Sequence, residues 1–244
     1  ACSGLPVSRN DLARPRIRVF PALAFLGRVS IERIFTFRTA RQVAEWEARS
    51  GRWRLFERAL VGDADGAQLL TLATGPFCVQ GDGALDVTAT IMRGDPDNFT
   101  DWDTGILLMS ELDADRNLSG LWFAYNSGED RGRFEVDVTV WAIERYNIDT
   151  DRGSRPRILC RNTSFRGIDP HDFNRHRVVM KGGRLEFHLN GTQVCTADDP
   201  GTFTPVSLAL MMAAPKGASL AQEHRVSVSH IIATAPAAEA MMCE

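Results

Sequence analysis

The sequence predicts an all-β fold, namely an antiparallel β-sandwich. After Trp53, short runs rich in β-branched and aromatic residues alternate with clusters of Gly, Asp, Asn and Pro, as strands and turns of an all-β protein do. Within several runs, apolar and polar residues alternate with period two, so each strand buries one face and exposes the other. Two sheets packed face to face satisfy this pattern.

The expected elements follow in order along the chain. Residues 1–28 are rich in Arg and Pro and form an irregular lead-in, residues 29–236 form the sandwich, and residues 237–244 form a tail. Thr39 is expected to cap a short helix that ends at Glu47. The predicted strands are residues 29–37, 53–56, 68–73, 84–92, 105–110, 120–126, 133–143, 157–165, 176–181, 184–190, 193–196, 205–213 and 225–234.

The alternation is clearest in residues 84–92, 133–141 and 184–190. One face of the segment 133–141 is wholly apolar. The opposite face carries Arg133, Glu135, Asp137, Thr139 and Trp141. Tight turns are expected at Gly182-Gly183 and Asn190-Gly191, because such dipeptides favour two-residue hairpin loops. The segment from Gly62 to Gly66 is predicted to be a further turn.

Composition indicates a globular protein and excludes one class of partner. Charged residues make up 24% and hydrophobic residues 44% of the chain, an ordinary mix for a protein with a core. The net charge is −3 and the arginines are scattered, so no basic stripe for nucleic acid is present. No run of 18 apolar residues is present, so no transmembrane helix is expected.

The first residues indicate export. The sequence Ala-Cys-Ser-Gly around Cys2 resembles the junction of a bacterial lipoprotein signal, where a small residue precedes the Cys that receives the lipid. The alternatives are an ordinary signal-peptidase scar and the end of an expressed fragment. We therefore expect a secreted protein, or a cell-surface or periplasmic lipoprotein attached through Cys2. Four N-x-S/T sequons, at Asn98, Asn117, Asn162 and Asn190, are compatible with a glycosylated secreted protein.

The five cysteines show neither a CxxC pair nor metal-ligand spacing. Cys160 lies in a predicted strand and Cys195 follows the turn at Asn190, so both flank the hairpin at 176–190. Neighbouring strands can bring their Cα atoms within the roughly 4.4–6.8 Å that bridging needs, and we predict a Cys160–Cys195 disulfide. A second bridge, between Cys2 and Cys243, competes with lipidation of Cys2.

Three segments resemble a known family. The run His176–Val194, HRVVMKGGRLEFHLNGTQV, resembles the hairpin of concanavalin-A-like domains, in which apolar residues alternate around a central Gly and end at an Asn-Gly turn. The segment Gly105–Tyr125 is similar to the preceding hairpin of laminin-G-like modules, and Trp46–Leu60 looks like their first strand. The resemblance covers residues 46–234 and implies a concanavalin-A-like jelly roll. This fold hosts lectins, glycosidases, lyases and adhesion modules.

One subgroup is similar in a further motif. Asn126-Ser127-Gly128, followed by Phe134-Glu135-Val136, resembles the corresponding stretch of 3-keto-disaccharide hydrolases. This resemblance implies a hydrolase in which Glu135 acts with support from Arg133 and Asn126.

Glu135, Asp137 and Trp141 stand on one predicted strand face. Carboxylates two residues apart on a strand are separated by about 7 Å, within the range that inverting glycosidases use. Glu135 and Asp137 are therefore candidate catalytic residues, and Trp141 is a candidate platform for a sugar ring. The stretch is also similar to the motif of retaining β-glucanases, which is Glu-x-Asp-x-Glu or, in a longer form, Glu-x-Asp-x-x-Glu. The acid/base Glu is replaced by Thr139 in the shorter form and by Val140 in the longer one. The alternative is a solvated strand face without a ligand.

Further candidates lie on other strands. Glu186 and His188 share an outward strand face, and His188 is the candidate base that would complete the catalytic set with Glu135 and Asp137. The candidate substrate-binding residues are Arg133, Trp141, Trp122, Asn126 and Glu186.

Asp113, Asp115 and Asn117 are candidate calcium ligands. They have the alternating oxygen spacing of calcium loops, although Leu118 and Ala124 replace the Gly and Glu that an EF-hand requires. The alternative is a hairpin tip, for which Asp and Asn are favoured residues. No other cofactor is expected.

Two classes of function remain open. The first is a carbohydrate-interacting sandwich that binds a glycan on its concave sheet or, as a glycoside hydrolase, cleaves it. The second is a non-catalytic structural or adhesion module that contacts protein partners.

Overall fold

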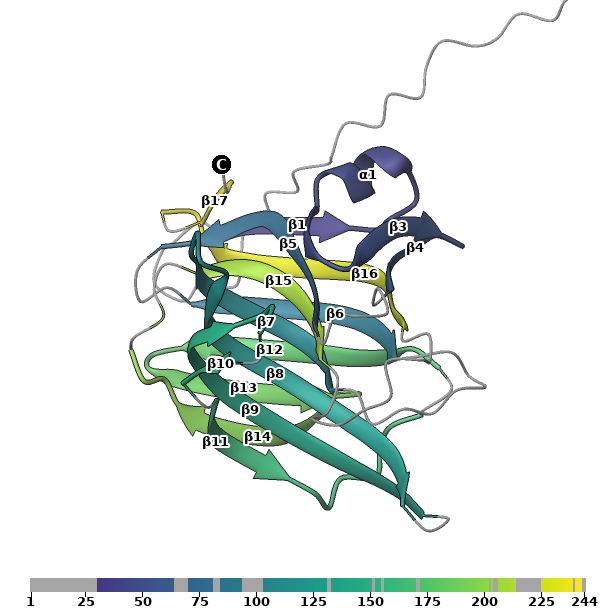
Figure 1. The fold of residues 1–244 in the computed structure, drawn as a ribbon, viewed down its shortest axis with the longest axis vertical. Helices are drawn as coiled ribbons and strands as arrows, with labels where there is room; N and C mark the ends of the chain where they lie inside the picture. Colours follow the sequence, from purple (N-terminus) through teal and green to yellow (C-terminus); the bar gives the residue numbers. More distant parts are fainter. Residues whose placement is uncertain are drawn as a thin grey trace, which may run out of the picture.

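The protein is a sandwich of two antiparallel sheets, as predicted (Figure 1). The computed structural model describes residues 30–63, 70–80, 84–93, 103–130, 133–150, 152–154, 156–169, 172–201, 203, 206–213, 225–238 and 240–242. For residues 126–130, 133–136 and 242, the backbone alone is described.

The eight-stranded sheet has the order β14-β13-β12-β6-β16-β4-β3, with β1 also paired to β16. Its strands are β1 (Ser30–Phe35), β3 (Arg52–Phe56), β4 (Ala59–Asp63), β6 (Leu85–Arg93), β12 (Asn174–Lys181), β13 (Arg184–Leu189), β14 (Thr192–Asp198) and β16 (Arg225–Pro236).

The nine-stranded sheet has the order β10-β9-β8-β7-β15-β5-β17, with β11 paired to β9 and β2 paired to β5. Its strands are β2 (Glu47–Ser50), β5 (Leu70–Val79), β7 (Asp103–Leu112), β8 (Asn117–Asp130), β9 (Arg133–Asn147), β10 (Arg152–Gly153), β11 (Arg157–Asn162), β15 (Val206–Ala213) and β17 (Ala240–Met242). The helix α1 (Ala40–Ala44) precedes β2, and Thr39 caps it as predicted. The predicted end of the helix at Glu47 is wrong, because Glu47 is the first residue of β2. None of the helices in the described part of the chain is long and apolar enough to cross a membrane.

The main core fills the space between the sheets. Alternate residues of both sheets point into it, which confirms the predicted period-two pattern. At its centre the rings of Phe123 on β8 and Phe187 on β13 meet edge to face, with centroids 5.9 Å apart. The ring of Tyr125 lies beside that of His176 on β12, at 4.9 Å. Contacts of this kind hold the two sheets face to face.

A second apolar cluster lies on the outer face of the nine-stranded sheet. It contains residues that alternate with those of the main core, including Leu107, Met109, Trp122, Ala124, Ala209 and Met211. The side chain of Arg116, in the β7–β8 turn, donates a 2.6 Å hydrogen bond to the carbonyl oxygen of Arg49 on β2. Since three strands separate β8 from β2 in the sheet, this bond spans a strongly curled outer face.

The described part of the chain contains four strands that the sequence analysis did not predict: β2, β4, β10 and β17. The strand β17 lies in the segment predicted to be a tail and pairs with β5. The predicted turn at Gly62 is wrong for Gly62 and Asp63, which lie in β4. A Cβ atom at Gly62 would lie 2.8 Å from the indole of Trp53, so the glycine is explained by close packing rather than by a turn.

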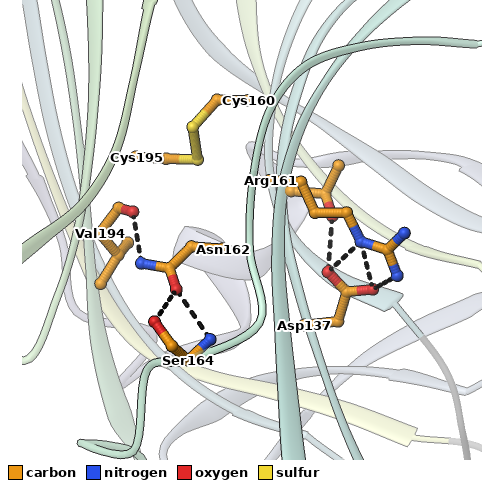
Figure 2. The surroundings of a disulfide bond; sticks show 8 residues. Asp137, Cys160, Arg161, Asn162, Ser164, Val194 and Cys195 are labelled. Carbon is orange, nitrogen blue, oxygen red and sulfur yellow. Dashed lines mark hydrogen bonds and ion pairs between the residues drawn. A yellow bond between two sulfur atoms is a disulfide. The ribbon is translucent and has the colours of Figure 1, made fainter.

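Cys160 and Cys195 form the predicted disulfide, with their Cα atoms 5.9 Å apart (Figure 2). The bond joins β11, at an edge of the nine-stranded sheet, to β14, at an edge of the eight-stranded sheet. The predicted bridge between Cys2 and Cys243 lies outside the described residues. Cys78 is also disulfide-bonded.

We expect the double substitution Cys160→Ser/Cys195→Ser to lower the free energy of unfolding by about 3–4 kcal/mol. The reason is that the bond closes a loop of 35 residues in the unfolded chain. Guanidinium denaturation of the wild-type and variant proteins measures the difference. A decrease of less than about 1 kcal/mol would contradict the expectation.

His176 is the one fully buried histidine among the described residues. Its ring lies between Tyr125 and Phe187, and neither ring nitrogen has a hydrogen-bond partner in the described structure. Burial lowers the pKa of His176 to about 3, because the core cannot solvate an imidazolium. The folded protein therefore keeps His176 neutral at pH values where an unfolded chain would protonate it.

This burial predicts an acid-sensitive core. Between pH 6.5 and about pH 3 the unfolded state binds a proton at His176 and the folded state does not. The free energy of unfolding should therefore fall by about 1.4 kcal/mol for each pH unit below 6.5. Urea denaturation of the wild type and of His176→Phe over pH 4–8 tests this. The variant should lose that part of the pH dependence, and parallel curves would refute the assignment.

Candidate functional site

The sandwich places its polar side chains on two outer faces. On β9, Val138 and Val140 point into the main core, so Asp137, Thr139 and Trp141 lie on the outer face of the nine-stranded sheet. On β13, by contrast, Leu185, Phe187 and Leu189 point into the same core. Their neighbours therefore lie on the outer face of the other sheet.

The expected catalytic set is split by this arrangement. Glu186 and His188 lie on the opposite outer face of the sandwich from Asp137, with the main core between them. The prediction that they complete a site with Asp137 is therefore wrong. The side chains of Arg133, Glu135 and Asn126 lie outside the described residues; in the backbone register, Asn126 stands opposite Asp137 on the neighbouring strand.

Five residues form what we call the β9–β11 patch: Asp137, Thr139, Trp141, Ile158 and Arg161. They come from two adjacent strands, since Trp141 pairs with Ile158 and Thr139 pairs with Arg161 in the antiparallel register. All five therefore lie on the same outer face.

An ion pair organises the polar side of this patch. Arg161 Nε donates to both carboxylate oxygens of Asp137 at 3.0 Å, and its Nη2 donates to Oδ2 in addition (Figure 2). The hydroxyl of Thr139 donates to Asp137 Oδ1 at 3.1 Å. The hydrogen bonds with Asp137 raise the pKa of Arg161 above its ordinary value. The side chain of Arg161 is 54% exposed, so this planar charged pair faces solvent.

The apolar side of the patch is formed by Trp141 and Ile158. Trp141 is half-buried against the second apolar cluster, and Ile158 is 45% exposed. Trp122 is the cross-strand neighbour of Trp141 but is only 6% exposed, so it packs beside Trp141 and offers little surface of its own. Neither indole N–H has a hydrogen-bond partner in the described structure.

This arrangement suits binding better than double-displacement hydrolysis. Thr139, at the position of a β-glucanase acid/base, is 4% exposed and hydrogen-bonded to Asp137. The negative charge of Asp137 is in turn balanced by Arg161. Both carboxylate oxygens of Asp137 are thus already engaged by Arg161 and Thr139 within the patch.

The outer face of the eight-stranded sheet carries a separate charged group. His188 Nε2 lies 3.1 Å from Glu186 Oε2. Arg177 on β12 binds Asp86 on β6 through two hydrogen bonds of 2.9 and 2.6 Å. This pair resembles Arg161–Asp137 in geometry, but its surroundings differ. The residues paired with it in the strand register are Thr88, Val179, His188 and Thr234, and none of them is a tryptophan.

The candidate calcium ligands form the tip of the β7–β8 hairpin. Asp113 accepts hydrogen bonds from the backbone N–H of Asn117 at 2.8 Å and from its side-chain amide at 3.0 Å. These bonds, first of all the one from the side chain, lower the pKa of Asp113. Within the described residues no group of three His, Cys, Asp or Glu side chains is placed to hold a metal. Calcium binding at Asp113, Asp115 and Asn117 stays a prediction.

Three of the four sequon asparagines use their side-chain amide inside the fold. Asn117 donates to Asp113, Asn162 donates to the carbonyl of Val194 at 2.9 Å, and Asn190 donates to the carbonyl of Gly167 at 2.7 Å. Figure 2 shows the bond from Asn162 beside the disulfide. The amide nitrogen to which a glycan would be attached is therefore a structural donor in each. Asn98 lies outside the described residues.

Sequence reasoning missed Arg161. Its position directly after Cys160 could have indicated it. A disulfide between the two sheets requires Cys160 to point inward, so the next residue on the strand, Arg161, points outward. Its partner Asp137 is found only through the β9–β11 register.

This topology is that of a concanavalin-A-like β-sandwich. No family model matches the sequence, and no curated protein matches it. Solved structures match the fold. The chain is similar to the κ-carrageenase of Pseudoalteromonas carrageenovora in complex with a κ-carrageenan oligosaccharide, with 12% identity, a TM-score of 0.54 and coverage of 89% of this chain and 99% of that one.

Two further structures are of the same kind. The carbohydrate recognition domain of Emp46p matches with 12% identity and a TM-score of 0.58, covering 82% of this chain and 94% of that one. The Crh5 transglycosylase matches with 14% identity and a TM-score of 0.54, covering 83% of each chain. These structural neighbours are carbohydrate-active enzymes and a carbohydrate recognition domain. At these identities the likeness shows the shared fold.

The disulfide indicates that the protein works outside the cytoplasm, since such bonds persist in oxidising compartments. Cys2 lies outside the described residues, and its lipidation stays a prediction.

The different burial of Trp122 and Arg161 predicts different effects on stability. Trp122→Ala should lower the free energy of unfolding by about 3–5 kcal/mol, because it empties a buried site. Arg161→Ala should cost about 1 kcal/mol or less, because its ion pair is exposed. Urea denaturation of both variants measures these values. A larger loss for Arg161→Ala than for Trp122→Ala would show that the patch is a structural element.

Proposed function

We propose that this protein binds a glycan on the β9–β11 patch. The observation that carries the proposal is the arrangement of Trp141 and Ile158 beside the Arg161–Asp137 pair on one outer sheet face. An apolar surface can cover the C–H face of a sugar ring, and a planar charged pair can exchange paired hydrogen bonds with neighbouring hydroxyls.

The exposure of these groups supports this role. Ile158 is 45% exposed on a strand whose inward residues pack in the core, and an exposed apolar side chain beside a half-buried Trp141 leaves apolar surface open to a ligand. Arg161 is held by three hydrogen bonds to one carboxylate, so little side-chain entropy remains to be lost on binding. The patch is preorganised and open.

The carbohydrate-related structural neighbours agree with a ligand of this class. The κ-carrageenase structure holds an oligosaccharide, and the Emp46p structure is a carbohydrate recognition domain. We favour binding over hydrolysis for the present chain, because Thr139 occupies the position of the missing acid and Arg161 neutralises Asp137. A catalytic role for Glu135 belongs to the hydrolase alternative.

We expect Arg161→Ala and Trp141→Ala each to weaken glycan binding about tenfold or more, because each removes a charged hydrogen-bonding group or the main apolar contact. A glycan array identifies the ligand, and calorimetry measures its affinity for the wild type and the variants. Arg177→Ala is the matched control, since it breaks a similar Arg–Asp pair on the opposite face and should leave the affinity unchanged.

Three outcomes separate the alternatives. Loss of binding in both patch variants with unchanged binding in Arg177→Ala supports the proposal. Release of reducing sugar from a bound polysaccharide would show a hydrolase instead. The absence of binding to every glycan tested would favour a structural or adhesion module that contacts protein.

A further inference from the structure

A pocket lies on the nine-stranded sheet, away from the β9–β11 patch. It has a volume of about 160 Å³ and is formed between β2 and the outer faces of β5, β7 and β15. Its lining side chains are Glu45, Glu47, Arg49, Thr74, Met109 and Ser207, together with the Gly75-Pro76 segment of β5. Thr74 lies four strands from Trp141 in the sheet order, which is about 19 Å measured along the sheet at the usual strand spacing.

Hydrogen bonds fix the β2 wall of this pocket. Arg49 Nε donates to the hydroxyl of Thr74 at 3.2 Å, and Arg49 Nη2 lies 2.5 Å from Glu47 Oε2. The carbonyl oxygen of Arg49 also accepts the hydrogen bond from Arg116 in the β7–β8 turn. Both the side chain and the backbone of Arg49 are thus fixed by hydrogen bonds. These bonds help to hold β2 in place beside β5.

Gly75 lets the strand below the pocket lie close to the main core. A Cβ atom at Gly75 would point into that core and lie 2.8 Å from the indole of Trp46. Met109 and Pro76 give the pocket an apolar portion, and Thr74 gives it a hydroxyl. Because the Thr74 oxygen accepts from Arg49, its hydrogen can still be donated to a ligand.

The pocket is lined by two negatively charged side chains, Glu45 and Glu47, and one positively charged side chain, Arg49. Arg49 is paired with Glu47, whereas Glu45 has no ion pair or hydrogen bond through its carboxylate within the described part of the chain. Arg116 approaches from the side but is paired with Asp149 at 3.2 Å. One negative charge is therefore left over at the pocket, on the exposed carboxylate of Glu45.

We propose that this pocket binds a single amino sugar ring, with the ammonium group of the sugar at Glu45. The volume matches one six-membered ring, since a cavity of roughly 150 Å³ holds benzene. Thr74 and the Glu47–Arg49 pair face the ring hydroxyls, and Met109 faces its carbon atoms. The unpaired carboxylate selects an ammonium group over a neutral substituent through a charge-assisted hydrogen bond. The site does not depend on the proposed function of the β9–β11 patch.

Titration of the full chain with glucosamine, glucose and N-acetylglucosamine tests the proposal, with binding followed by NMR chemical shifts. Glucosamine should bind about three- to fivefold more tightly than the two sugars without a charged amine, as expected for a partly exposed ion pair. Glu45→Gln, which keeps the size of the side chain, should remove this preference. Glu144→Gln is the matched control, because Glu144 is an exposed glutamate that does not line the pocket.

Each result decides the matter. Loss of the preference in Glu45→Gln, with the preference kept in Glu144→Gln and in Arg161→Ala, supports the amino sugar site. Equal affinity for the three sugars, or a preference that survives Glu45→Gln, overturns the role of Glu45. The absence of glucosamine binding overturns the pocket as a site, even if oligosaccharides bind the β9–β11 patch.

Discussion

Phe123, Tyr125 and Phe187 meet between the two sheets, and the burial of these and the other inward side chains is the constraint on which the rest of the structure depends. Each strand must give alternate residues to this shared core, because burial of its apolar face is what holds it in place. Every second residue is then forced outward. The chemistry available to the protein is consequently confined to two outer faces that the core keeps apart.

The two outer faces use similar groups in different surroundings. Both carry an Arg–Asp pair that joins adjacent strands, Arg161–Asp137 on one face and Arg177–Asp86 on the other. Of these two pairs, the first has a tryptophan, Trp141, on the same strand face, whereas neither strand of the second pair, β6 or β12, contains a tryptophan. Since an exposed ion pair contributes little stability in itself, the aromatic and apolar neighbours are what distinguish a binding surface from a solvated one.

The disulfide links the core to this surface. Cys160 points inward to bond Cys195 on the other sheet, and the next residue, Arg161, therefore points outward to Asp137. Fixing the edge strand β11 also fixes the guanidinium that it carries. Toward the opposite edge of the same sheet, Arg116 and Arg49 have a comparable effect, because their contact helps to fix β2, which lines the pocket.

The sequence by itself determined the features that depend on neighbouring residues. The alternation in β9 and β13, the cap at Thr39 and the turn at Asn190 were all predicted, because each is encoded within a few residues. Only the tertiary structure decided which outward residues share a face. Alternation shows that the side chains of Asp137 and His188 both point away from the core. The sheet to which each strand belongs, however, depends on pairing between distant segments of the chain. For the same reason the burial of Trp122 and the pairing of Arg161 with Asp137 had to come from the structure, since both arise from residues that are far apart in the chain.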